Sequence, residues 1–115
     1  MKAEDKKLLV KAICGYLPYD GFLEVNYDNE ICDCVGYVHG KVILTKKFSS
    51  VSFGVDVESV KPYLRPMSSM TEEEERIYFN FLSWKGKMEF CQEKHLDYYD
   101  LIEKGIAIEM PKDMY

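Results

Sequence analysis

The segment from Lys61 to Glu74 constrains the fold of this chain more than any other part of its sequence. Pro62 and Pro66 stand four residues apart in it. A proline has no backbone N–H, and it disfavours a helical conformation in the residue before it. Thr71 and Glu74 then have the spacing of a capping box, which starts a helix. The segment therefore marks the point at which the chain changes from strand-like to helical patterns.

The part of the chain before this segment predicts one helix and a small sheet. Residues 4–14 have the apolar spacing of an amphipathic helix, and Gly15 fits the position just after its end. Residues 21–57 alternate between apolar and polar side chains in four short runs, which is typical of strands joined by tight turns. These strands predict an antiparallel meander, and they also allow a curled, SH3-like roll.

Short-range signals mark the turns and bends of this predicted sheet. Asp28-Asn29 and His39-Gly40 are turn sequences between apolar runs. Gly36 and Gly54 lie inside predicted strands, where glycine often accompanies a bulge.

The part after the segment predicts short helices. A helix begins at Thr71 and ends near Lys85-Gly86, a second covers Met88 to Lys94, and Asp97 caps a third that ends at Gly105. Residues 106–108 are extended. We expect the first of these helices to cover the sheet with a stripe of four side chains: Ile77, Tyr78, Phe81 and Leu82.

The predicted fold class is therefore α+β in a single domain over residues 1–115. Residues 1–60 form the half with the N-terminal helix and the sheet, residues 61–70 cross between the halves, and residues 71–115 form a cluster of short helices. A length of 115 residues is near the common size of one domain.

Charge and composition exclude several classes of function. The net charge of −5 argues against binding through broad neutralisation of phosphates. A nucleic-acid-associated module remains as an alternative, with Lys41, Lys46 and Lys47 as its basic cluster. The sequence has no apolar run long enough to span a membrane and a charged start that does not fit a signal peptide, so we expect a cytoplasmic protein with no membrane partner.

The four cysteines predict packing rather than chemistry. Cys32 and Cys34 point to the same face of a strand, and no further cysteine or histidine has the spacing of a zinc site. Cys91 and His95 lie one helical turn apart, but a catalytic pair also needs an orienting group and an oxyanion site. We expect no cofactor, no metal and no catalytic residues.

An aromatic and acidic group of residues near the end of the chain is the candidate interaction surface. Exposed tyrosines anchor protein interfaces well, while the alternative is that two of these tyrosines pack against the last helix. The candidate residues are Tyr63, Asp97, Tyr98, Tyr99, Asp100 and Tyr115.

Three segments resemble a family of small uncharacterised phage- and prophage-associated proteins of gut bacteria. The segments are Leu17-Pro18-Tyr19, the block KPYLRPMSSMTEEE at residues 61–74, and the tail from His95 to Tyr115 with the pattern DY..LIEKG.A.E.P..MY. Leu96 and Tyr99-Asp100 depart from the family's tail. The resemblance implies a phage or prophage source and carries no activity.

These observations lead to one functional expectation with two alternatives. The chain is expected to be a non-catalytic accessory protein that binds a macromolecule, in the first place another protein. The alternatives are the nucleic-acid-associated module and an enzyme of unrecognised type.

Overall fold

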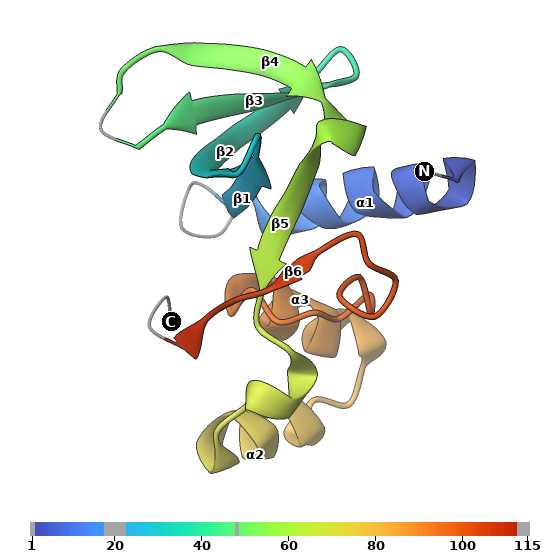
Figure 1. Cartoon of the computed structure of the whole chain (residues 1–115). Helices are drawn as coiled ribbons and strands as arrows, with labels where there is room; N and C mark the ends of the chain where they lie inside the picture. The colour runs from blue at the N-terminus through green and yellow to red at the C-terminus, as the bar shows by residue number, and fades with distance from the viewer. Residues whose placement is uncertain (1, 18–22, 48, 113–115) are drawn as a thin grey trace.

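A curled sheet with one helix occupies one end of the molecule, and two further helices lie at the other end (Figure 1). The computed structural model describes residues 2–17, 23–47 and 49–112. The elements in chain order are α1 (Ala3–Tyr16), β1 (Leu23–Tyr27), β2 (Glu30–Val38), β3 (Lys41–Lys46), β4 (Ser52–Asp56), the 3-10 turn η1 (Val57–Ser59), β5 (Val60–Leu64), the 3-10 turn η2 (Met67–Ser69), α2 (Glu72–Asn80), α3 (Trp84–Glu93) and β6 (Ile108–Glu109). The fold class is α+β, as the sequence predicts.

The six strands form one mixed sheet in the order β4-β3-β2-β1-β5-β6. Both predicted hairpin turns are present, with φ values of 51° and 61° at Asp28 and Asn29 and of 53° and 81° at His39 and Gly40. Two successive positive φ values characterise the type I′ turn, whose twist matches that of the flanking strands. The β2–β3 register shifts between Cys34 and Gly36, which confirms the bulge predicted at Gly36.

The bulge predicted at Gly54 is wrong, because Gly54 pairs with Ile43 within an unbroken register. The sheet is nevertheless strongly curled. The rings of Tyr27 on β1 and Phe53 on β4 pack with their centroids 5.8 Å apart, although β2 and β3 lie between these strands in the sheet. The expected meander is therefore partly rolled.

Helix α1 covers the inner face of the sheet and closes the main core. The apolar stripe of α1 buries four side chains against alternating residues of the central strands, since successive residues of a strand point to opposite faces. The buried residues of the helix and of β1 to β3 are Leu9, Ala12, Ile13, Tyr16, Leu23, Val25, Cys32, Cys34, Val42 and Leu44.

Gly15 lies inside α1 and does not end it, which corrects the predicted helix boundary. The side chain of Gln92 on α3 packs against Gly15, and a Cβ at this position would lie 2.3 Å from its Nε2 atom. The glycine thus lets the Gln92 side chain lie directly on the backbone of α1, and a larger residue here would require that side chain to move.

Strand β5 connects the two ends of the molecule. Val60 and Pro62 pair antiparallel with β1, while Tyr63 and Leu64 pair parallel with β6. The first residues of the predicted crossing segment therefore belong to the sheet. The predicted extended segment at 106–108 is a strand only at its last residue, because β6 covers Ile108–Glu109 and residues 106 and 107 form a bend.

The prediction that the helix after Thr71 covers the sheet is wrong. Helix α2 buries none of its residues, and three side chains of the predicted stripe are exposed: Ile77 by 41%, Phe81 by 37% and Leu82 by 104%. The fourth, Tyr78, is half-buried. The reason is that α1 already occupies the inner face of the sheet, so α2 contacts α3 instead.

Two other helix boundaries also differ from the prediction. The break falls at Phe81 to Ser83, and the Ser83 hydroxyl caps α3 by accepting from the backbone N–H of Gly86 at 3.1 Å. The third predicted helix is a series of turns, in which the carboxylate of Asp97 accepts from the N–H groups of Leu101 and Ile102. Among the described residues, no helix has both the length and the apolar character to cross a membrane.

Candidate functional site

A buried ion pair fixes helix α2 to the end of β5. The guanidinium of Arg65 donates two hydrogen bonds to the carboxylate of Glu74, at 3.0 and 2.8 Å, and a third to the carbonyl oxygen of Ser69 at 3.2 Å. Only 10% of the Arg65 side chain and 16% of the Glu74 side chain are exposed. This pairing lowers the pKa of Glu74 to about 2, because the neighbouring guanidinium favours the charged carboxylate.

The same Glu74 completes the capping box that the sequence predicts. Its carboxylate accepts from the backbone N–H of Thr71 at 3.0 Å, and the Thr71 hydroxyl accepts from the backbone N–H of Glu74 at 3.1 Å. One carboxylate thus joins the first turn of α2 to Arg65 and satisfies a backbone donor at the helix start.

The backbone of Arg65 holds the end of α3 in place as well. Its N–H donates to the carbonyl of His95 at 2.9 Å, and its carbonyl accepts from the N–H of Asp97 at 2.8 Å. Between these residues, the carbonyl of Leu96 accepts a hydrogen bond from the buried hydroxyl of Tyr16 on α1. Helix α2 is therefore attached to the end of β5, and the residues that end α3 are attached to both β5 and α1.

A second, smaller apolar cluster lies between α2 and α3. Phe90, Cys91 and Leu96 are its buried members, and Tyr78 and Met67 pack against them. These side chains give the α2–α3 hairpin (residues 72–93) an interior of its own, and Tyr78, which is half-buried, also turns its ring toward Lys87.

The outer face of the α2–α3 hairpin carries the most exposed aromatic surface of the described chain. We call it the hairpin surface, and it consists of Ile77, Phe79, Phe81, Leu82 and Trp84. The exposed fractions are 66% for Phe79, 104% for Leu82 and 73% for Trp84. At the usual size of such side chains, the five expose on the order of 500 Å², which is near the upper end for the largest apolar patch on a monomer.

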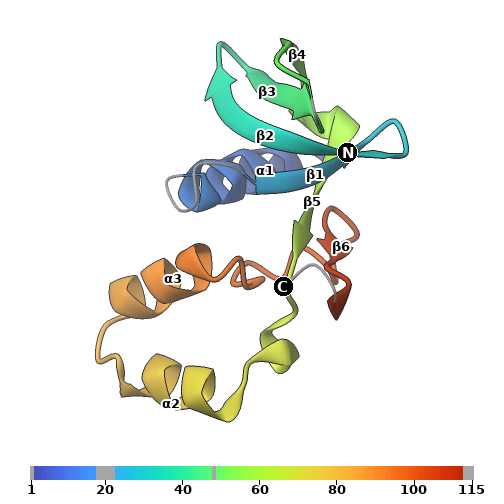
Figure 2. The same ribbon diagram turned by 90° about the vertical axis from the view of Figure 1, so that its left-hand side faces the viewer.

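The hairpin surface lies at the opposite end of the molecule from β4 (Figure 2). Lys87 joins two of its rings, because its ammonium nitrogen lies 5.9 Å from the ring centroid of Phe79 and 5.1 Å from that of Trp84. Phe81 packs inward on Phe90, with the ring centroids 6.0 Å apart. Lys87 therefore joins Phe79 and Trp84, while Phe81 is shared between the surface and the interior of the hairpin.

The structure does not bring the predicted interaction residues together on an exposed surface. Tyr63 is 8% exposed and accepts a hydrogen bond from Asn26, and Asp97 is 5% exposed. Their burial removes both side chains from any binding surface. Burial also raises the pKa of Asp97, against the effect of the two N–H groups that its carboxylate binds.

The other predicted residues are only partly available. Tyr98 and Tyr99 are half-buried and pack edge to face, with their ring centroids 5.3 Å apart. Asp100 is exposed. Tyr115 lies outside the described residues, as do Pro18 and Tyr19.

The lysines of the predicted basic cluster are each engaged by an acidic side chain. Lys41 pairs with Asp56 at 2.7 Å, Lys46 with Glu30 at 3.4 Å, and Lys47 with Asp33 at 2.6 Å. The pairing of these lysines with carboxylates leaves little positive potential on this rim of the sheet for phosphate groups.

Three of the four cysteines are buried, as the packing prediction requires, whereas Cys14 is exposed on α1 and departs from that prediction. Burial raises the pKa of both Cys34 and Cys91 to about 11, so neither thiol is ionised near neutral pH. The ring of His95 packs edge to face on Tyr16, with the centroids 5.8 Å apart. Within the ranges that the structure describes, no group of cysteine, histidine and acidic side chains has the arrangement of a metal site.

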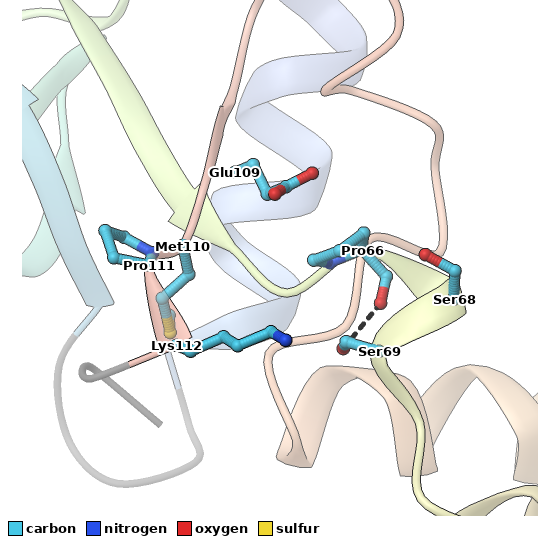
Figure 3. A pocket seen from close by; sticks show the side chains of 7 residues that line it. All are labelled: Pro66, Ser68, Ser69, Glu109, Met110, Pro111 and Lys112. Atoms are coloured by element: carbon cyan, nitrogen blue, oxygen red, sulfur yellow. Dashed lines mark hydrogen bonds between the residues drawn. The ribbon is translucent and has the colours of Figure 1, made fainter.

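A pocket of about 600 Å³ lies between η2 and the residues after β6 (Figure 3). Its described lining carries one acid, Glu109, and one base, Lys112, and the hydroxyl of Ser69 donates to the carbonyl of Pro66 at 2.7 Å. Neither histidine nor cysteine lines it. The hydroxyl of Ser69 is thus engaged by a backbone carbonyl and not by a general base.

Comparisons with protein-family models, with curated proteins and with solved structures find no match to this chain.

The sequence analysis did not predict the hairpin surface. A signal was present, because Ile77 to Trp84 contains more apolar residues than one helical stripe can bury.

Proposed function

We propose that this chain is a non-catalytic accessory protein that binds another protein through the hairpin surface. The exposure of Phe79, Leu82 and Trp84 is the observation that carries this proposal. Protein interfaces are enriched in aromatic side chains, and tryptophan is among the residues that most often contribute binding energy.

The surface is exposed without any benefit to the fold. Helix α2 buries none of its residues, and the hairpin packs through its inner cluster. A large apolar patch on a monomer usually marks an interaction site, because exposed apolar area favours association. A partner that covers the surface would explain why these residue types stand here.

The attachment of the hairpin also supports binding. The Arg65–Glu74 ion pair and the Tyr16–Leu96 hydrogen bond hold the hairpin in one orientation. A surface that is already ordered loses less conformational entropy when it binds. The resemblance to phage- and prophage-associated proteins supports an accessory role inside the host cell, and we propose the cytoplasm as its location.

The nucleic-acid alternative receives less support. The three lysines on which it depends pair with carboxylates, and the net charge of the chain is −5. A catalytic alternative has no observation in its favour, since neither the pocket nor the cysteines supply a reactive pair.

A capture experiment with two matched triple variants tests the proposal. Phe79→Ala, Leu82→Ala and Trp84→Ala together remove the hairpin surface. Three exposed apolar residues outside the hairpin serve as the control: Ile31→Ala, Val38→Ala and Val51→Ala, at 40%, 51% and 69% exposure. Each tagged protein is incubated with lysate of host cells, and the captured proteins are quantified.

The expected result is one or more proteins that the parent and the control retain and the hairpin variant loses. Thermal melts of all three proteins should agree closely, because no substituted side chain is buried. Capture of the same proteins by both variants at parental levels would overturn the proposal, as would loss in the control alone.

A further inference from the structure

Three aromatic rings of the hairpin surround the ammonium group of Lys87. The nitrogen lies 5.3 Å from the ring centroid of Tyr78, 5.9 Å from that of Phe79 and 5.1 Å from that of Trp84. We call these three residues the ring cluster. Aromatic faces attract cations within about 6 Å of the ring centroid, and clusters of such rings are used to bind cationic ligands.

We propose that the ring cluster binds an arginine side chain of the protein partner, and that Lys87 occupies this site until the partner displaces it. The proposal rests on the proposed function, because it assigns a chemistry to the partner that docks on the hairpin surface. It adds a specific contact that involves Phe79 and Trp84 of that surface.

The charge of the chain favours a basic partner. The net charge is −5, and the hairpin itself (residues 72–93) carries six acidic and three basic side chains, with Glu72, Glu73 and Glu75 exposed on the first turn of α2. Complementary charge speeds the encounter of two proteins and orients them as they approach. An apolar surface on a hairpin with an excess of acidic side chains is therefore suited to a partner that presents cations.

The aromatic faces favour arginine over lysine. A guanidinium is planar and more weakly hydrated than an ammonium, and it stacks on aromatic rings. Lys87 can leave without breaking a salt bridge, because no ion pair involves it among the residues that the structure describes. When a guanidinium of the partner replaces the ammonium of Lys87, the contact between the cation and the aromatic rings therefore becomes larger.

Fluorescence of Trp84 reports directly on the occupancy of this site, since the chain has a single tryptophan. The full-length parent and Lys87→Ala are titrated with the blocked tripeptide Gly-Arg-Gly and with its citrulline counterpart, which is neutral and of nearly the same shape. A blocked Gly-Lys-Gly peptide forms the third arm. Lys11→Ala is the matched control, because Lys11 lies 5.9 Å from the ring centroid of Tyr99, away from the hairpin surface.

Removal of the Lys87 ammonium should make the ring cluster accessible to other cations. We expect Lys87→Ala to bind the arginine peptide about tenfold more tightly than the parent does, while Lys11→Ala matches the parent and the citrulline peptide gives no saturable change. Phe79→Leu added to Lys87→Ala should weaken the arginine peptide again, because one aromatic face is lost.

Three results would overturn the proposal: equal affinities of parent and Lys87→Ala, equal responses to arginine and citrulline, or tighter binding of the lysine peptide. Failure here would leave the proposed function standing if the hairpin variant still lost its partner. If the peptide titration gives the expected result but the hairpin variant keeps its partner, the proposed function is rejected and the ring cluster remains only a site for cations.

Discussion

Arg65 and Glu74 form a two-bond ion pair that closes the turn η2 onto the first turn of α2. The pair stands nine residues apart in the sequence and is largely buried. Removal of one partner from a buried pair leaves an uncompensated charge, which commonly costs about 3–5 kcal/mol. We expect Arg65→Ala to lower the free energy of unfolding by about 3 kcal/mol, measured in urea.

Arg65→Lys is the control for this first prediction. It keeps the positive charge but not the paired donors, so its loss should be intermediate. A change below about 0.5 kcal/mol for Arg65→Ala would place the pair among ordinary surface pairs and contradict its role in holding the hairpin.

Sequence patterns predicted the local features well. The turns at Asp28-Asn29 and His39-Gly40, the bulge at Gly36 and the capping box of Thr71 each depend on a few neighbouring residues, and all are present. The buried state of Cys32 and Cys34 follows from the two-residue period of a strand.

The placement of the helices could not be predicted in the same way. Both α1 and α2 carry apolar residues at helical spacing, and periodicity does not show which helix covers the sheet. Tertiary packing decides it, because Leu9 and Ile13 of α1 fill the inner face, while Ile77 of α2 and Leu82 just after it stay outside. The hairpin surface was not predicted for this reason, because helical spacing places Ile77, Phe81 and Leu82 in the core and the structure exposes them.

The low pKa of Glu74 predicts a specific pH dependence. A folded-state pKa of about 2, against an ordinary value of 4.5, means that the unfolded chain takes up the proton first as the pH falls. The stability from this carboxylate is therefore complete above about pH 4.5 and is lost between about pH 4.5 and 2. Glu74→Gln should flatten the stability profile over this window, in urea melts at a series of pH values.

Glu73→Gln is the matched control for this titration. Glu73 lies on the same helix turn but is exposed, so its variant should follow the parental profile. Identical profiles for parent and Glu74→Gln would show that the ion pair does not depress this pKa.

The capping box gives a smaller prediction. Thr71→Ala should cost about 1 kcal/mol of stability, because the backbone N–H of Glu74 loses its acceptor. Thr71→Ser keeps the hydroxyl and should lose much less. Unfolding curves of Thr71→Ala that overlay those of the parent would contradict the cap.

The two ends of the molecule should unfold together. The main core contains Leu101, Ile106 and Ala107 from the last part of the chain, and β6 pairs with β5. We expect a chain that ends at Met70 to fail to fold, because it loses these residues and the Leu96 carbonyl that Tyr16 binds. A dispersed amide spectrum and a cooperative melt for residues 1–70 would instead show two independent domains.

Photo-crosslinking from the hairpin surface tests the central claim most directly. A photoreactive phenylalanine is placed in host cells at position 82, where Leu82 is fully exposed, and separately at position 38, where Val38 is 51% exposed on the sheet. We predict a discrete crosslinked protein from position 82 that is absent from position 38 and that disappears with Phe79→Ala and Trp84→Ala. Crosslinks from position 38 alone, or none from position 82, would contradict the assignment of the hairpin surface as the site of binding.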